Sequence, residues 1–221
     1  MFGIPKFLFY SFLLISVFFY SVPQIDLWVT SLFFNEQQGF YLSETLWARF
    51  GYALIPVLTT SIAIFLIFSI VFTLIRKRTL FSFGSKAYLY MLLTLIIGPG
   101  LIVNNTFKEN WNRSRPVSVI EFGGTNAFSP AFVINDACTQ GSCTSFSSGH
   151  PTTFFAFLSL AMLLTGRRRK QVIYFSVIGG AMIGFVRIVQ GGHFLSDVVV
   201  SGMVVTSVAY SLYWLMYPER R

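Results

Sequence analysis

Charged side chains are scarce in this sequence, and acidic ones are scarcest. Asp, Glu, Lys and Arg together make up 11% of the 221 residues, against roughly 25% in an average soluble domain. The mean hydropathy is +0.67. These values exclude a water-soluble fold. They also exclude a disordered chain, because a chain that is 54% hydrophobic does not stay solvated. Most of its length is therefore expected to lie in lipid.

The long apolar stretches predict an all-α fold, because spanning a bilayer takes about 20 mostly apolar residues per helix. We expect one membrane domain over residues 1–221 with six transmembrane helices. The first is expected to be an uncleaved anchor, since no cleavage site of small residues follows its apolar run. A short apolar segment at 25–34 is expected to lie on the outer surface. The six stretches are residues 7–22, 51–75, 87–105, 150–166, 171–189 and 195–216.

The basic residues are distributed unevenly between the two sides of this arrangement. Lys and Arg in short loops resist translocation, so the side that collects them is predicted to face the cytoplasm, together with both termini. The net charge of +8 and the pI of about 9.7 then reflect topology and not a nucleic-acid partner. The basic residues of that side are Lys6, Arg76, Lys77, Arg78, Lys86, Arg167, Arg168, Arg169, Lys170, Arg220 and Arg221.

A second group of ionisable residues lies at the outer ends of the last four predicted helices. Both histidines of the chain belong to it. A single Lys or Arg there commonly extends to lipid headgroups, and a single His commonly caps a helix. Headgroup contacts and helix caps poorly explain a whole set of ionisable residues at one depth of the membrane. Ionisable groups near membrane depth are functional candidates. The set comprises Lys108, Arg113, Arg115, His150, Arg187, His193 and Asp197.

These residue types suit a phosphate group. Arg presents a planar fork to phosphate oxygens and Lys a point charge, so Lys108, Arg115 and Arg187 could neutralise a phosphoryl group. The segment Ser148-Gly149-His150 is expected to start a helix. Free N–H groups at a helix start bind anions, and Gly149 would let the backbone approach closely.

His193 and Asp197 are four residues apart, a spacing that brings both side chains to one face of a helix. An aspartate that accepts one imidazole N–H fixes the tautomer and leaves the other nitrogen free to attack phosphorus. His150 could donate a proton to the leaving oxygen and later activate water.

The sequence resembles the type 2 phosphatidic acid phosphatase superfamily in a three-part signature of the right order and spacing. The resemblance implies metal-independent hydrolysis through phosphohistidine, without a cofactor. His193 would be the nucleophile, Asp197 its orienting partner and His150 the acid and base. Ser147 and Val186 depart from residues common in the family, which affects only the shape of the cradle. The parts are Lys108-x6-Arg115-Pro116, Ser148-Gly149-His150 and Arg187-x5-His193-x3-Asp197, with Lys108, Arg115, Ser148, Gly149 and Arg187 as implied phosphate binders.

Within the superfamily, the chain is similar to bacterial lipid A phosphatases, and more to the 4′-phosphatases than to the 1-phosphatases. The similarity rests on Gly98-Pro99-Gly100, the run Trp111-x-Arg113-x-Arg115-Pro116 and a Cys-containing outer loop. It implies a lipid phosphate substrate and a bacterial inner-membrane enzyme whose site faces the periplasm. Arg113 lies outside the general signature. We expect it to contact the glycan or a second phosphate, with headgroup contact as the alternative.

Cys138 and Cys143 fall in that outer loop, where an oxidising compartment would let them pair. Such a disulfide would shape the loop and take no part in the chemistry.

Other functions remain open from sequence. The enzyme could transfer the phosphoryl group to another lipid, or act on phosphatidylglycerol phosphate or undecaprenyl diphosphate. The basic cluster could serve a lipid-binding or transport protein that is no enzyme. His150, His193 and Asp197 could ligate a metal ion, although three nearby cations would repel it.

Overall fold

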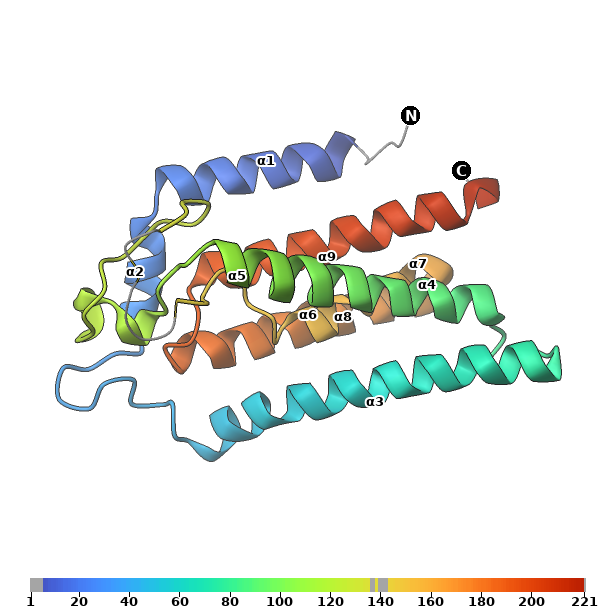
Figure 1. Ribbon diagram of the computed structural model, residues 1–221, viewed down its shortest axis with the longest axis horizontal. Coiled ribbons are helices and arrows are strands. Elements are labelled where there is room, and N and C mark those ends of the chain that lie inside the picture. Colours follow the sequence, from blue (N-terminus) through green and yellow to red (C-terminus); the bar gives the residue numbers. More distant parts are fainter. Residues whose placement is uncertain (1–5, 136–137, 139–142, 221) are drawn as a thin grey trace.

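The computed structural model describes residues 6–135, 138 and 143–220. Arg221, one of the basic residues of the predicted cytoplasmic side, lies outside the described residues, and so do both ends of the predicted 1–221 domain. The described part consists of helices joined by turns and loops, with isolated bridges and no named strand. The all-α prediction is confirmed (Figure 1).

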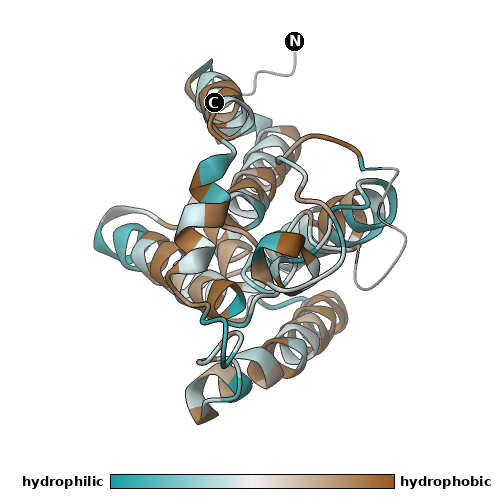
Figure 2. Ribbon diagram, turned by 90° about the vertical axis from the view of Figure 1, so that its left-hand side faces the viewer, coloured by the Kyte–Doolittle hydropathy of each residue, from teal (hydrophilic) through white to brown (hydrophobic). Residues whose placement is uncertain are grey.

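Four helices of the described part are long and apolar enough to cross a membrane. Figure 2 shows brown, hydrophobic stretches along the helices of the bundle. Large apolar side chains on them face outward, for example Phe68 and Leu74, each 59% exposed. A helix with apolar residues all round is typical of a membrane span. The four are α3 (Leu46–Arg76), the continuous helix Ser85–Asn110, α8 (Gly166–Val189) and α9 (Leu195–Met216).

The N-terminal helices form a bent pair. Helix α1 (Lys6–Ser21) is followed by α2 (Gln24–Ser31) at an angle of 77°, and the pair counts as a fifth candidate span only if taken together. The predicted anchor corresponds to α1. The predicted surface segment begins in α2, which crosses the end of the bundle (Figure 1).

The fourth predicted span is where the structure differs most from the sequence prediction. Two short helices, α6 (Thr152–Phe155) and α7 (Leu158–Leu163), occupy that region. The 12 residues from Thr152 to Leu163 would cover about 18 Å at 1.5 Å per residue, less than the roughly 30 Å of a hydrocarbon core. The helices therefore give four or five candidate spans, and the count of six is not confirmed.

The helix Ser85–Asn110 carries Lys108, the first residue of the signature. It consists of α4 (Ser85–Leu95), a π-helix η1 (Ile96–Phe107) and the last turn α5 (Lys108–Asn110). Pro99 lies in the π-helical part, which is consistent with its missing N–H. Val103 of this part packs against α9 in a buried cluster, so the packing fixes the position of Lys108 one turn beyond. The remaining elements are the short 3₁₀ helices η2 (Pro116–Ser118), η3 (Ile120–Phe122) and η4 (Pro218–Arg220).

Candidate active site

The signature residues meet at the end of the bundle that α2 crosses (Figure 1). Lys108 lies in the last turn of the Ser85–Asn110 helix, Arg187 in the last turn of α8, and Asp197 in the first turn of α9. Burial, together with the nearby charges of Arg187, His193, Lys108 and Arg115, lowers the pKa of His150 to about 3. The fold thus brings together residues from all three parts of the signature.

His193 is held by a backbone carbonyl. Its Nδ1 lies 2.7 Å from the carbonyl oxygen of Ser145. A carbonyl oxygen only accepts hydrogen bonds, so Nδ1 carries the proton and Nε2 keeps its lone pair. Burial lowers the pKa of His193 to about 4, against the opposing effect of Asp197, and the positive charge of Arg187 adds to the lowering. The imidazole is therefore neutral at pH 7.

Asp197 is not the direct partner of the imidazole that the sequence predicts. Its Oδ2 lies 3.7 Å from Nδ1 of His193, beyond hydrogen-bond distance. The same oxygen accepts hydrogen bonds from Ser145 Oγ at 2.6 Å and from the backbone N–H of Phe194 at 2.8 Å. The latter contact caps the N-terminus of α9. Asp197 therefore acts on His193 through Ser145, whose carbonyl holds the ring.

Arg113 does not reach the substrate side of the site, so that prediction is wrong. Its side chain is completely buried and forms ion pairs with Asp197 at 2.6 Å and with Asp26 of α2 at 2.8 Å. Burial opposes the guanidinium charge, but the two carboxylates outweigh it and raise the pKa of Arg113. Sequence reasoning missed Asp26. The sequence signal that could have pointed to Asp26 is the presence of an acidic residue within an apolar segment.

His150 lies against an aromatic ring that the sequence analysis also missed. The rings of His150 and Tyr52 stack with centroids 4.6 Å apart and an interplanar angle of 22°. The Cζ atom of Arg187 lies 4.7 Å from the centroid of the same Tyr52 ring. Nε2 of His150 is buried and has no hydrogen-bond partner among the described residues. Tyr52, near the start of α3, thus contacts a predicted acid and a predicted phosphate binder.

The guanidinium groups of Arg115 and Arg187 are anchored on one side only. Arg115 donates to Thr144 Oγ1 at 3.0 Å, and Arg187 to Gln190 Oε1 at 2.5 Å. The Nε atoms of both are buried without a partner within the described part of the chain. Burial lowers the pKa of Arg115. Each side chain therefore keeps N–H groups that suit an anion.

The second part of the signature packs closely against the first. A Cβ atom added to Gly149 would lie 2.5 Å from Oδ1 of Asn104 and 3.1 Å from Nζ of Lys108, so any larger residue here would have to displace these side chains. The backbone N–H of Ser148 donates to the carbonyl oxygen of Asp197 at 3.1 Å. That N–H is engaged, whereas Ser148 Oγ is buried without a partner in the described segments. Helix α6 begins at Thr152, two residues after His150 and later than predicted.

Two hollows of different character lie beside Tyr52. A polar pocket of about 460 Å³ is open to the outside and includes both signature arginines. An apolar groove of about 830 Å³ runs between α3 and α8. Its lining includes Gly51 and Val186, which directly precede Tyr52 and Arg187 in the sequence. The polar pocket is lined by Ser43, Glu44, Arg49, Tyr52, Ala53, Arg115, Arg187 and Gln190.

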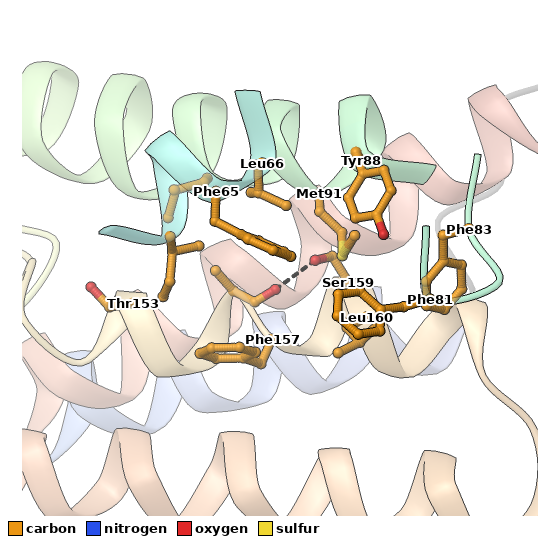
Figure 3. A pocket seen from close by; sticks show the side chains of 13 residues that line it. Phe65, Leu66, Phe81, Phe83, Tyr88, Met91, Thr153, Phe157, Ser159 and Leu160 are labelled. Atoms are coloured by element: carbon orange, nitrogen blue, oxygen red, sulfur yellow. Dashed lines mark hydrogen bonds between the residues drawn. The ribbon is translucent and has the colours of Figure 1, made fainter. Parts of the chain in front are cut away.

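A third cavity lies deeper among α3, α4, α6 and α7, with a volume of about 270 Å³. Figure 3 shows Phe65, Leu66 and Phe157 around it. No charged residue lines it, so it cannot bind a phosphate group.

The connection between η3 and α6 carries a disulfide between Cys138 and Cys143. Ser114 Oγ lies 3.1 Å from Sγ of Cys138, which ties this loop to the segment between Arg113 and Arg115. Within the described residues, no group of three or more His, Cys, Asp or Glu side chains could hold a metal ion.

Comparison with known proteins gives the family. Residues 87–221 match the sequence model of the PAP2 superfamily. The chain belongs to the PAP2 superfamily. This agrees with the resemblance seen in the signature, all of which falls inside the matched residues. No solved structure matches the chain.

The PAP2 region also resembles curated relatives. Over 136 residues, 61% of this chain and 60% of the relative, it is 40% identical to a lipid A 4′-phosphatase of Francisella tularensis subsp. novicida. It is 32% identical to a lipid A 4′-phosphatase of Rhizobium leguminosarum over 122 residues, which are 54% of this chain and 52% of that protein. The matched part is thus about half to three fifths of these relatives.

Proposed function

We propose that this chain is an integral membrane phosphatase that removes a phosphate monoester from lipid A, at the 4′ position, through a phosphohistidine at His193. The observation that carries the proposal has two parts. The guanidinium groups of Arg115 and Arg187, whose Nε atoms have no partner in the described part, line one pocket. The imidazole of His193, whose Nε2 keeps its lone pair, lies close enough to Arg187 and Lys108 for their charges to act on it. The 4′ position comes from the relatives, which are lipid A 4′-phosphatases.

In the first step, Lys108, Arg115 and Arg187 neutralise the phosphate oxygens. The lone pair of His193 Nε2 attacks phosphorus while the bond to the sugar oxygen breaks. His150 gives its proton to that leaving oxygen. In the second step, His150 takes a proton from water, the water oxygen attacks phosphorus, and the P–N bond breaks to release inorganic phosphate and restore His193.

His150 must be protonated for the first step, although its low pKa keeps it neutral before substrate binds. Cations are one cause of that low pKa, and a bound phosphate offsets their charge. A phosphate that arrives as the monoanion also carries the proton that His150 needs. Binding of substrate therefore prepares the acid.

The two hollows beside Tyr52 support an amphipathic substrate. The apolar groove between α3 and α8 suits acyl chains, and the polar pocket next to it suits a phosphorylated sugar. Arg49, exposed in the first turn of α3, takes the role that sequence analysis gave to Arg113. It contacts the glycan or a second phosphate, and Glu44 beside it accepts hydrogen bonds from sugar hydroxyls.

The whole chain acts as one membrane domain in the inner membrane of a bacterium, with the site at the periplasmic face. The segments rich in Lys and Arg, at the end of α3 and the start of α8, lie at the end of the bundle away from α2 (Figure 1). The end of α9 also lies there. This supports six crossings, with α6 and α7 forming the fourth, and both termini in the cytoplasm.

Mass spectrometry of lipid A from cells expressing the wild-type chain or H193Q tests this function. Wild type should remove the 4′-phosphate, and H193Q should not. Loss of the 1-phosphate alone would show that the enzyme acts at the 1 position and not at the 4′ position. No phosphate loss in either strain would contradict lipid A as the substrate. Purified wild type with and without a second lipid acceptor separates hydrolysis from transfer. Full activity after exhaustive chelation is expected, because no metal takes part.

A further inference from the structure

A fully buried ion network lies behind the imidazole of His193. It joins Asp26 of α2, Arg113 of the segment after α5 and Asp197 of α9, and all three side chains have no exposed surface. One guanidinium nitrogen of Arg113 contacts Asp26 Oδ2 at 2.8 Å, and the other contacts Asp197 Oδ1 at 2.6 Å. Helix α2 lies outside the region that matches the PAP2 superfamily, so this network crosses the boundary of that region.

Further hydrogen bonds complete the network. Nε of Arg113 donates to the carbonyl oxygen of Ser129 at 2.9 Å, and NH1 donates to Ser196 Oγ at 2.8 Å. Asp26 accepts from the backbone N–H of Ser196 at 2.9 Å and from its hydroxyl at 2.5 Å. The N–H of Ser196 is one of the free donors at the start of α9. Asp26 therefore caps that helix from a different part of the chain.

The network reaches His193 by two routes. Asp197 holds Ser145 Oγ and the N–H of Phe194, the residue that follows His193. The carbonyl of Arg113 accepts the N–H of Ser145 at 3.0 Å, so Arg113 holds Ser145 as well. Ser145 in turn provides the carbonyl that fixes Nδ1 of His193. A shift of Arg113 would therefore move both the partner of the imidazole and its neighbour in the chain.

We propose that Asp26 is a positioning residue for the nucleophile: it holds Arg113, and through Arg113 it fixes Asp197, Ser145 and the imidazole of His193. The inference rests on the proposed phosphohistidine chemistry. Asp26 does not contact the phosphate binders Lys108, Arg115 and Arg187. Its loss should therefore slow attack on phosphorus and leave phosphate binding intact, because a small displacement of a reacting group costs rate and not affinity.

The test compares D26N with E36Q, which makes the same acid-to-amide change at an exposed residue nearby. Purified proteins in detergent are assayed for kcat, KM, inhibition by inorganic sulfate and melting temperature. Phosphoenzyme formation is followed by alkaline quench. D26N should lower kcat and the rate of phosphoenzyme formation by about 10- to 100-fold. Its KM and sulfate inhibition should stay within about two-fold, and E36Q should match wild type.

A second variant covers the case in which D26N does not fold. S196A removes the hydroxyl that links Asp26 and Arg113 and keeps both charges. It should lower kcat by about five-fold with unchanged sulfate inhibition. Wild-type kcat in folded D26N or in S196A would overturn the inference, and so would equal losses of kcat and of sulfate binding. If wild type forms no phosphohistidine, the proposed function fails instead, which the same quench reveals.

Discussion

The rings of Tyr52 and His150 lie nearly parallel with centroids 4.6 Å apart, and Cζ of Arg187 lies 4.7 Å from the centroid of the same Tyr52 ring. One aromatic side chain of α3 thus positions both a predicted proton donor and a predicted phosphate binder. A cation against an aromatic face gains about 0.5–2 kcal/mol. Tyr52 therefore connects the N-terminal part of the chain with the PAP2 region at the site itself.

Two substitutions of Tyr52 should distinguish the contribution of its ring to activity from that of its hydroxyl. Y52A should lower kcat/KM by roughly five-fold or more, because His150 and Arg187 both lose the face that holds them. Y52F keeps the ring and should lose much less. Steady-state kinetics of the two variants measure this. Equal losses in both would show that the hydroxyl matters and the stacking does not.

Binding of an inert dianion should become tighter as the pH falls. Free His150 has a pKa of about 3, and a bound dianion raises that pKa, so the complex takes up a proton that the free site does not hold. The affinity for sulfate, which stays a dianion, should therefore rise as the pH falls from 7 to 5, by at most about ten-fold per pH unit. Calorimetry measures it.

H150Q serves as the control for this pH dependence. It should bind sulfate with an affinity that changes little over the same range, since Gln does not titrate. An affinity of wild type that stays flat or weakens toward acid pH would contradict the protonation scheme.

Gly149 allows the second part of the signature to lie against the first. A methyl group there would approach Asn104 Oδ1 to 2.5 Å and Lys108 Nζ to 3.1 Å, so G149A should displace Lys108 and raise KM. The loss should be about ten-fold or more in kcat/KM. The double variant G149A/N104A should recover part of it, because it removes the closer obstacle. A G149A enzyme with wild-type KM would show that Lys108 is not displaced.

Arg49 is expected to contact the headgroup beyond the reacting phosphate. R49A should raise KM for lipid A and change KM little for a small water-soluble phosphate ester. R78A is the matched control, because it removes an exposed arginine at the opposite end of α3. Equal effects of R49A on both substrates would assign Arg49 to general attraction of anions and not to recognition.

The sequence predicted which residues meet but not how they are held. Lys108, Arg115, His150, Arg187 and His193 could be selected because polar groups in an apolar chain are few. Their spacing also matched a signature. The partner of His193 could not be found in this way, because it is the backbone carbonyl of Ser145, and every residue has a carbonyl.

Long-range pairs were beyond reach for a similar reason. Arg113 sits within the first signature run, which suggested contact with substrate, but its partner Asp26 is 87 residues away. Pro23 marks a break between α1 and α2, but no local residue gives the 77° angle that brings α2 to α9. Tyr52 was one aromatic residue among many in a chain with 26 phenylalanines. The break between α6 and α7 was equally hidden, because apolar residues continue through it.

Trapping the covalent intermediate tests the central claim most directly. Wild type and H150Q are mixed with a labelled phosphate ester that has a good leaving group, quenched in alkali and mapped by mass spectrometry. The phosphoryl group should be found on His193. It should accumulate in H150Q, because water attack needs His150 as base. Turnover without any label on His193, or label on another residue, would contradict the account.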